Sequence, residues 1–418
     1  MFKHLQESEA LLEQFTGHLS EKRYSPKVIK RYSSVARHFL LFLERKHVQA
    51  TSAQPRDIAM YLKRELTLFR KHHARAPFSQ RAWQVSHTTG IQAFMRMLNE
   101  QWPPIPCSNT PVESFIQRLC RQFAHWLADE RALAATTISD RSDEARRFLS
   151  WYLSRSNTEC LLELQLADID AYLQERSISL RRPSRNSVSQ RLRCFMRFAH
   201  ISGNTARDFA PSVMSPTLYA FESIPSALSP QEISAVLQTT HKDNSPKGFR
   251  DYAILMLLST YGLRVGEITQ MQLGDVDWRA NRFCVRHTKT GAQSFFPLLA
   301  HVGEALLEYL QRARPDTDVR EIFIRARAPY QGFESGSSLY TPIRRRIEEA
   351  GIHPKGKRGP HTFRHARAVS LLRANVAPKV IGDVLGHRSA SSIMAYLKLQ
   401  TEDLRSVALE IPSFQESI

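Results

Sequence analysis

Apolar residues recur at steps of three and four along most of the first half of the chain. One such stripe comprises Ile29, Tyr32, Ala36, Phe39 and Leu43, and another comprises Ile138, Ala145, Phe148, Leu149 and Tyr152. This spacing places the apolar side chains on one face of an amphipathic α-helix. The first half of the chain is therefore predicted to be almost wholly helical.

Stretches of the first hundred residues resemble stretches of the second hundred. The paired segments are Phe15–Arg23 with Phe123–Arg131, Ala36–Leu43 with Ala145–Leu153, Asp57–Leu62 with Asp168–Leu173, and Phe94–Leu98 with Phe195–Ala199. We interpret them as two copies of one small helical domain, joined through the proline-containing segment Trp102–Glu113. The alternative is that any two amphipathic four-helix segments share such a pattern.

The periodicity disappears in a second proline-containing linker, Thr205–Leu228, and a mixed pattern follows. The residues Ser229-Pro230-Gln231-Glu232 form the capping box of a new helix, and a further helix is predicted over Asp251–Thr260, ending near Gly262. Strands are predicted at Arg282–Arg286 and Ser294–Leu298, with a hairpin tip at Thr290-Gly291 between them. The whole pattern predicts a mainly α protein with a small antiparallel β-sheet, the sheet belonging to an α+β domain.

Charge narrows the class of partner. The chain has 58 Lys and Arg residues against 40 Asp and Glu residues, a formal net charge of +18. This excess favours an anionic partner, usually nucleic acid, although anionic lipid would also attract it. No apolar run approaches the ~20 residues of a membrane-spanning helix, and the N-terminus lacks a signal-peptide core. Five cysteines without CxxC spacing favour reduced thiols in a cytoplasmic protein, with no zinc site.

Two polar clusters occur in the first part of the mixed region. Arg264 follows a glycine break in the sequence Thr260–Glu267, and a guanidinium held there offers a planar fork for phosphate oxygens. A simple Arg264–Glu267 pair on a helix surface is the structural alternative. Lys289 lies at the predicted hairpin tip, where it could reach a ligand or merely be solvated.

Two more clusters follow towards the C-terminus. His361 and Arg364 are three residues apart and share one side of a helix that begins after Gly359-Pro360, where phosphate is favoured. A core histidine beside a surface arginine is the alternative. His387 follows the predicted helix Pro378–Leu385, and Tyr396 comes nine residues later on a short helix, where a tyrosine is usually a core residue.

The clusters indicate more together than each does alone. They supply one nucleophile, two guanidiniums, one ammonium and two imidazoles, without a carboxylate cage for a metal ion; the set is Arg264, Lys289, His361, Arg364, His387 and Tyr396. This combination matches metal-free phosphoryl transfer to a tyrosine.

At these positions the chain resembles the tyrosine recombinases of the phage integrase family, which includes lambda integrase and XerC/XerD. TYGLRVGE resembles the first arginine box of that family, TKTG its catalytic hairpin, and HTFRHARA with VIGDVLGHRSASSIMAYL its second box up to the nucleophile. The resemblance implies that Tyr396 attacks a DNA phosphate and that Arg264 and Arg364 bind its oxygens. It further implies the other roles: His361 as base, Lys289 as general acid, His387 as hydrogen-bond donor, and Glu267 as a supporting residue.

The resemblance also implies a domain order and partners. It predicts an additional N-terminal helical, SAM-like domain over 1–103 for DNA binding or interaction, a helical core-binding domain over 112–205, a linker over 206–226 and a catalytic domain over 227–418. The expected partners are double-stranded DNA, three further copies of the chain at synapsis and other recombinases, with no cofactor, metal or membrane. The expected reaction is integration, resolution or transposition. The alternatives are a type IB topoisomerase, a non-catalytic DNA-binding regulator and a metal-dependent nuclease.

Overall fold

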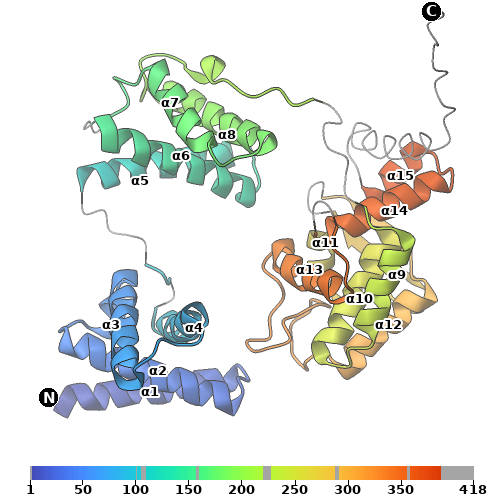
Figure 1. Cartoon of the computed structure of the whole chain (residues 1–418), viewed down its shortest axis with the longest axis horizontal. Coiled ribbons are helices and arrows are strands. Elements are labelled where there is room, and N and C mark those ends of the chain that lie inside the picture. Colours follow the sequence, from blue (N-terminus) through green and yellow to red (C-terminus); the bar gives the residue numbers. More distant parts are fainter. Residues whose placement is uncertain are drawn as a thin grey trace, which may run out of the picture. The chain divides into compact units, whose positions relative to one another are not determined.

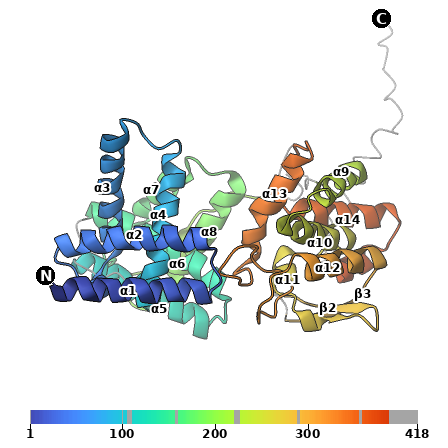
Figure 2. The ribbon, with the colours of Figure 1, turned by 90° about the horizontal axis from the view of Figure 1, so that it is seen from below.

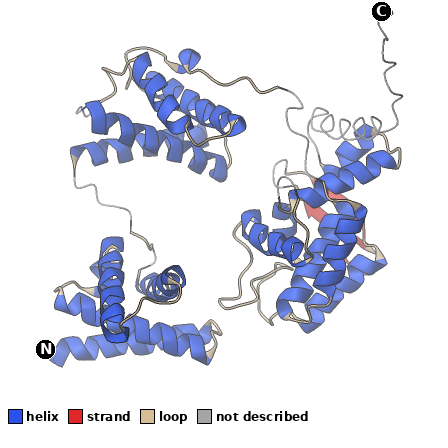
Figure 3. Ribbon diagram, in the orientation of Figure 1, coloured by secondary structure: helices blue, strands red, loops and turns tan. Residues whose placement is uncertain are grey.

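A computed structural model of the chain describes residues 2–99, 101–104, 110–156, 160–219, 227–287, 291–354 and 358–386. These residues form helices and one small antiparallel sheet (Figure 3), which confirms the predicted fold class. The chain divides into two compact units, residues 105–222 and residues 1–104 together with 223–418. Within the described ranges, every helix is too short or too polar to cross a membrane.

The first four helices pack around one aromatic core (Figure 1). They are α1 (Phe2–Glu21), α2 (Pro26–Arg45), α3 (Pro55–His73) and α4 (Gln80–Leu98), with a 3₁₀ turn at Ala50–Ser52. Helices α2 and α3 begin with proline, whose fixed φ suits the first helical position and whose missing N–H costs nothing there. Of the predicted stripe on α2, Tyr32, Ala36, Phe39 and Leu43 are buried and Ile29 is partly buried.

Residues 105–222 contain a second set of four helices around their own core. These are α5 (Pro111–Asp129), α6 (Ala135–Ser156), α7 (Leu166–Ser177) and α8 (Arg182–Ile201), followed by a 3₁₀ turn at Ala210–Ser212. A carboxylate, Glu144, is wholly buried among them. It is stabilised there because the Tyr172 hydroxyl donates to it at 2.6 Å and the Arg176 guanidinium lies at 3.3 Å.

The two four-helix sets repeat the same internal contacts at the positions that the sequence pairs. Each set has two edge-to-face aromatic pairs of nearly equal geometry: Phe15–Phe94 (5.2 Å, 76°) with Phe123–Phe195 (5.3 Å, 75°), and Phe39–Tyr61 (5.4 Å, 74°) with Phe148–Tyr172 (5.2 Å, 83°). Both α3 and α7 begin at a glutamine whose backbone N–H donates to an aspartate three residues on. The N–H of Gln272 donates to Asp275 in the same way at the 3₁₀ turn Leu273–Asp275, so this start is not specific to the two sets, and the aromatic pairs are the more distinctive likeness.

The remaining elements surround one apolar helix. The helices are α9 (Pro230–His241), α10 (Pro246–Tyr261), α11 (Val265–Thr269), α12 (Ala300–Arg312), α13 (Tyr340–Glu349), α14 (His361–Arg373) and α15 (Pro378–Leu385), with 3₁₀ turns at Leu273–Asp275 and Gly336–Leu339. Every residue of Ala253–Leu258 is buried, so α10 is covered on all sides, as a helix without a polar face must be. Its neighbours are α9, α12 and α14.

A three-stranded antiparallel sheet accompanies these helices, in the order β1 (Val276–Asp277), β2 (Arg282–Arg286) and β3 (Gln293–Pro297). Phe283 pairs with Phe296 on the buried face. The predicted bounds of β2 are confirmed. Strand β3 begins and ends one residue earlier than the predicted Ser294–Leu298. Helix α10 begins at Pro246, earlier than predicted, because Ser245 accepts a hydrogen bond from the N–H of Gly248 and so caps it.

Candidate functional site

Arg264 is held in place by three hydrogen bonds at the start of α11. Helix α10 ends at Gly262, which adopts the left-handed conformation (φ 67°) that glycine allows, and the chain turns there towards Arg264. The backbone N–H and Nη1 of Arg264 donate to the two oxygens of Glu267, at 2.7 and 2.8 Å. Its Nη2 donates to the carbonyl of Gly386 at 2.7 Å. The Arg264–Glu267 pair therefore forms part of a larger cluster.

His287 completes this cluster from the hairpin. Its Nδ1 lies 2.8 Å from Glu267 Oε1, and its Nε2 lies 2.9 Å from the hydroxyl of Ser294 on β3. A carboxylate only accepts hydrogen bonds, so Nδ1 carries the proton. Burial opposes ionisation of Glu267, but its bonds to His287 and Arg264 outweigh burial and hold the pKa of this carboxyl below its ordinary value.

His287 was not among the predicted site residues, although the sequence contains a signal for it. Phe283 and Val285 point to the buried face of β2, and the alternation of a strand continues to His287, which is also buried. A histidine on the inner face of a predicted hairpin, two residues before Lys289 in the sequence, is a candidate for a polar contact with the site.

Arg364 reaches the same place from α14. Its side chain is buried, and Nη1 donates to the carbonyl of Gly262 at 2.8 Å while Nη2 donates to the carbonyl of Leu385. The two arginines thus bind the carbonyls of two consecutive residues, Leu385 and Gly386. The structure brings Arg264, Glu267 and Arg364 together.

Gly386 lies at the centre of these contacts. It ends α15 in the left-handed conformation (φ 62°). A Cβ atom there would lie 2.9 Å from His287 Cε1, 3.1 Å from His287 Nδ1 and 3.3 Å from Arg264 Nη1. Glycine is therefore required for two reasons, the backbone conformation and the close approach of two side chains.

The other predicted site residues fall into two groups. His361 is the exposed first residue of α14, one turn before Arg364, and its ring centroid lies 6.2 Å from that of His365. Lys289, His387 and Tyr396 lie outside the described residues. Among the residues that are described, no group of three or more His, Cys, Asp or Glu side chains could hold a metal ion.

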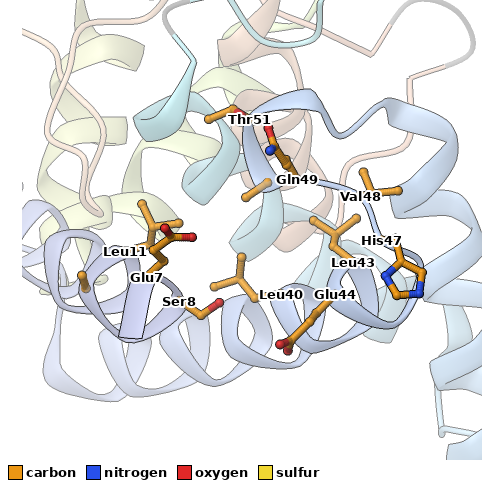
Figure 4. A pocket seen from close by; sticks show the side chains of 12 residues that line it. Glu7, Ser8, Leu11, Leu40, Leu43, Glu44, His47, Val48, Gln49 and Thr51 are labelled. Carbon is orange, nitrogen blue, oxygen red and sulfur yellow. The ribbon is translucent and has the colours of Figure 1, made fainter. Parts of the chain in front are cut away.

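A groove elsewhere in the chain has a different character. It is open, has a volume of about 680 Å³ and lies between α1, α2 and the turn that follows α2 (Figure 4). Leu11, Leu40 and Leu43 form its apolar wall, and Glu7 and Glu44 supply carboxylates. These negative charges would repel a phosphate, so the groove is not part of an anion site.

Known proteins resemble the chain over most of its length. The sequence profile described as the phage integrase family matches residues 226–403. The putative integrase/recombinase y4gC of Sinorhizobium fredii is 54% identical over 194 residues, which cover 46% of this chain and 100% of that protein. The putative integrase/recombinase y4rA of the same organism is 34% identical over 322 residues, 77% of each chain.

Two solved structures share the fold. XerH site-specific recombinase bound to a palindromic difH substrate matches 76% of this chain and 87% of its own, with a TM-score of 0.56 and 14% identity. A lambda integrase (75–356) dimer bound to a COC′ core site matches 72% of this chain and 99% of its own, with a TM-score of 0.53 and 16% identity. The fold is thus the one that site-specific recombinases and integrases use. Taken with the relatives in sequence, the chain belongs to the phage integrase family.

Proposed function

We propose that this chain, a site-specific recombinase of its family, cleaves and rejoins double-stranded DNA through a covalent 3′-phosphotyrosyl intermediate. The supporting observation is the convergence of Arg264 and Arg364 on the carbonyls of Leu385 and Gly386. Two guanidiniums, one from the residue that precedes α11 and one from α14, lie there, before the segment that carries Tyr396 in the sequence. Two planar, permanently charged groups suit the non-bridging oxygens of one phosphodiester.

The proposed reaction exchanges one phosphate ester for another. The phenol oxygen of Tyr396 attacks phosphorus, and its proton passes to His361, because a phenol with a pKa of ~10 is a poor nucleophile while protonated. The bond from phosphorus to the 5′-oxygen breaks, and Lys289 gives that oxygen a proton. A 5′-hydroxyl from another strand reverses both transfers, so rejoining needs no metal, nucleotide or other cofactor.

The remaining groups serve the transition state. Arg264 and Arg364 offset the negative charge that builds on the phosphoryl oxygens, and His387 donates a further hydrogen bond to them. Glu267 orients Arg264 and neutralises part of the positive charge. With both arginines charged and Glu267 ionised, these three side chains carry a net charge of +1. The Lys289 ammonium adds a further positive charge.

We propose the same assembly and domain roles that the family resemblance implies. Exchange between two duplexes requires four strand cleavages, which four copies of the chain can supply; lambda integrase has been solved as a tetramer bound to a Holliday junction. Residues 112–205 act as the core-binding domain and 227–418 as the catalytic domain, joined by the linker 206–226, with 1–103 as an additional domain. The protein acts in the cytoplasm, and other recombinases of the family can join it on DNA.

A covalent-capture experiment tests the proposal. Nicked duplexes that carry the inverted repeats flanking the gene are incubated with the full chain in EDTA, and protein–DNA adducts are separated under denaturing conditions. The wild-type chain should form an adduct, and Tyr396→Phe should form none. Tyr219→Phe is the matched control, because Tyr219 is exposed and far from the site in the sequence, and it should react as the wild type does.

The arginine variants test the phosphate roles in the same assay. Arg264→Ala and Arg364→Ala should bind DNA yet form adduct ~10²–10³-fold more slowly, the usual effect of removing one preorganised donor. An adduct in Tyr396→Phe would show that another residue is the nucleophile. DNA binding without any adduct would favour the DNA-binding regulator. Strict Mg²⁺ dependence of cleavage would favour the nuclease, and relaxation of plasmids that lack the repeats would favour the topoisomerase. Each of these results overturns the proposal.

A further inference from the structure

The hairpin formed by α3 and α4 has a strongly cationic tip. The segment from Lys63 to Arg81, both included, contains six Lys or Arg residues and one Glu. The tip itself, which we define as Arg70–Arg81, contains Arg70, Lys71, Arg75 and Arg81, all exposed. Within the described part of the chain, Lys71, Arg75 and Arg81 form no ion pair, so their charge is not neutralised by a neighbouring carboxylate.

An aromatic residue interrupts this cationic stretch of the sequence. Phe78, in the turn between α3 and α4, is fully exposed to solvent. Placing a phenyl ring in water forgoes the ~1.5–3 kcal/mol that burial would provide. Polar residues predominate in such turns, so an exposed ring between four cations is an unusual feature that requires an explanation.

The tip is held together by ring contacts and projects from its own bundle. The rings of Phe69 and His73 are 4.4 Å apart, those of Trp83 and His87 are 4.0 Å apart, and Phe69 also faces Trp83 across the hairpin at 6.3 Å. A hydrogen bond of 3.2 Å from Arg70 to Gln80 closes the end of the hairpin. Figure 2 shows this end rising away from α1 and α2.

The corresponding hairpin of the second four-helix set repeats this arrangement. The turn between α7 and α8 presents Ile178, which is 81% exposed, with Arg181, Arg182 and Arg185 exposed just after it. An exposed apolar residue beside arginines thus occurs at the same place in both sets. The two sets also share their aromatic pairs and their glutamine caps, so this likeness extends from the core to the surface.

We propose that the tip Arg70–Arg81 binds double-stranded DNA, with Arg70, Lys71, Arg75 and Arg81 on phosphates and Phe78 inserted at a groove. Inserted apolar side chains flanked by cations are a recurrent way of holding duplex DNA. A lipid surface is the poorer match, because stable membrane contact takes an extended apolar face and this tip offers one ring. The choice of DNA rests on the proposed function. The carboxylates of Glu7 and Glu44 lie in the groove of α1 and α2 (Figure 4), whereas the sequence Arg70–Arg81 contains no Asp or Glu.

Salt-dependent binding of the full chain to DNA tests this inference. Fluorescence anisotropy is measured on duplexes of about 20 and 60 base pairs, in the Tyr396→Phe background so that no covalent capture occurs. Each phosphate contact contributes about 0.9 to the slope of log affinity against log salt concentration. Arg75→Ala with Arg81→Ala should therefore lower the slope on the long duplex by about 2, and Phe78→Ala should weaken binding to it roughly tenfold.

A matched pair of substitutions controls for charge alone. Arg37→Ala with Arg45→Ala removes two exposed arginines from α2 in the same bundle, and it should leave the slope unchanged. An equal fall in slope for the control would show a diffuse field instead of a docking tip and would overturn the inference. Unchanged DNA binding in the tip variants would also overturn the inference. The same holds if the tip variants lose binding to phosphatidylserine vesicles while their binding to DNA stays unchanged. Because binding is measured without cleavage, a failure to form adducts does not affect the result.

Discussion

Replacing Gly386 with alanine should separate catalysis from stability. Two effects are expected from this one added methyl group. The first is backbone strain, because the left-handed conformation costs a residue with a Cβ about 1–2 kcal/mol. The second is steric: the new Cβ would lie 2.9 Å from His287 Cε1, and ordinary contact begins near 3.4 Å. The ring must therefore move by about 0.5 Å (3.4 − 2.9), away from a position fixed by Glu267 and Ser294.

Gly351 provides a control for the strain alone. It also has a positive φ (73°), and a Cβ there would meet nothing within 4 Å. Both Gly386→Ala and Gly351→Ala should lower the melting temperature by a few degrees, at about 2–4 °C per kcal/mol for a domain of this size. Only Gly386→Ala should slow covalent-adduct formation, by about 10²-fold, because small displacements of positioned groups cost about that much.

Single-turnover adduct formation and thermal unfolding, measured on both variants, decide the outcome. Equal rates for the two variants would refute the steric argument, whether both are slow or both are normal. A double variant adds a sharper test. If Gly386→Ala acts through His287, then adding it to His287→Ala should slow the reaction no further than His287→Ala does alone. Multiplicative losses would show that the methyl group acts elsewhere.

Two further predictions concern buried carboxylates. The pKa of Glu267 is held below its ordinary value of 4.5, so its ionised form contributes stability that is present above that value and lost as the pH falls through the lowered pKa. Glu267→Gln should therefore show a shallower loss of unfolding free energy between pH 7 and pH 3 than the wild type; an identical slope would contradict this. Tyr172→Phe removes the 2.6 Å hydrogen bond to buried Glu144 and should cost about 1–3 kcal/mol, seen as a lower urea midpoint, whereas an unchanged midpoint would show that other donors suffice.

The helices could be predicted because their apolar stripes are long and regular. Tyr32, Ala36 and Phe39 repeat at helical spacing, and the structure buries all three on α2. The start of α10 could not be predicted from periodicity, because Gly248 and Arg250 are buried although neither has an apolar side chain. The capping serine at Ser245 was the available signal.

The site could be predicted in part for a similar reason. The sequence pointed to Arg264 and Arg364 through residue type and spacing. Their partners are backbone carbonyls: that of Gly386 for Arg264, and those of Gly262 and Leu385 for Arg364. Because every residue has a carbonyl, such partners leave no pattern in the sequence. The link from Glu267 through His287 to Ser294 depends on the hairpin register, which sequence alone gave only to within one residue.

The bonds from the two arginines to Leu385 and Gly386 also anchor the start of the following segment. Tyr396 is ten residues beyond Gly386, and ten residues reach at most about 36 Å when fully extended. That length is an upper limit on the distance between the Cα atoms of Gly386 and Tyr396 in one chain. Two copies can therefore exchange this tyrosine only if the arginine pair of one copy lies within that span, extended by the length of a tyrosine side chain, of Gly386 in the other copy.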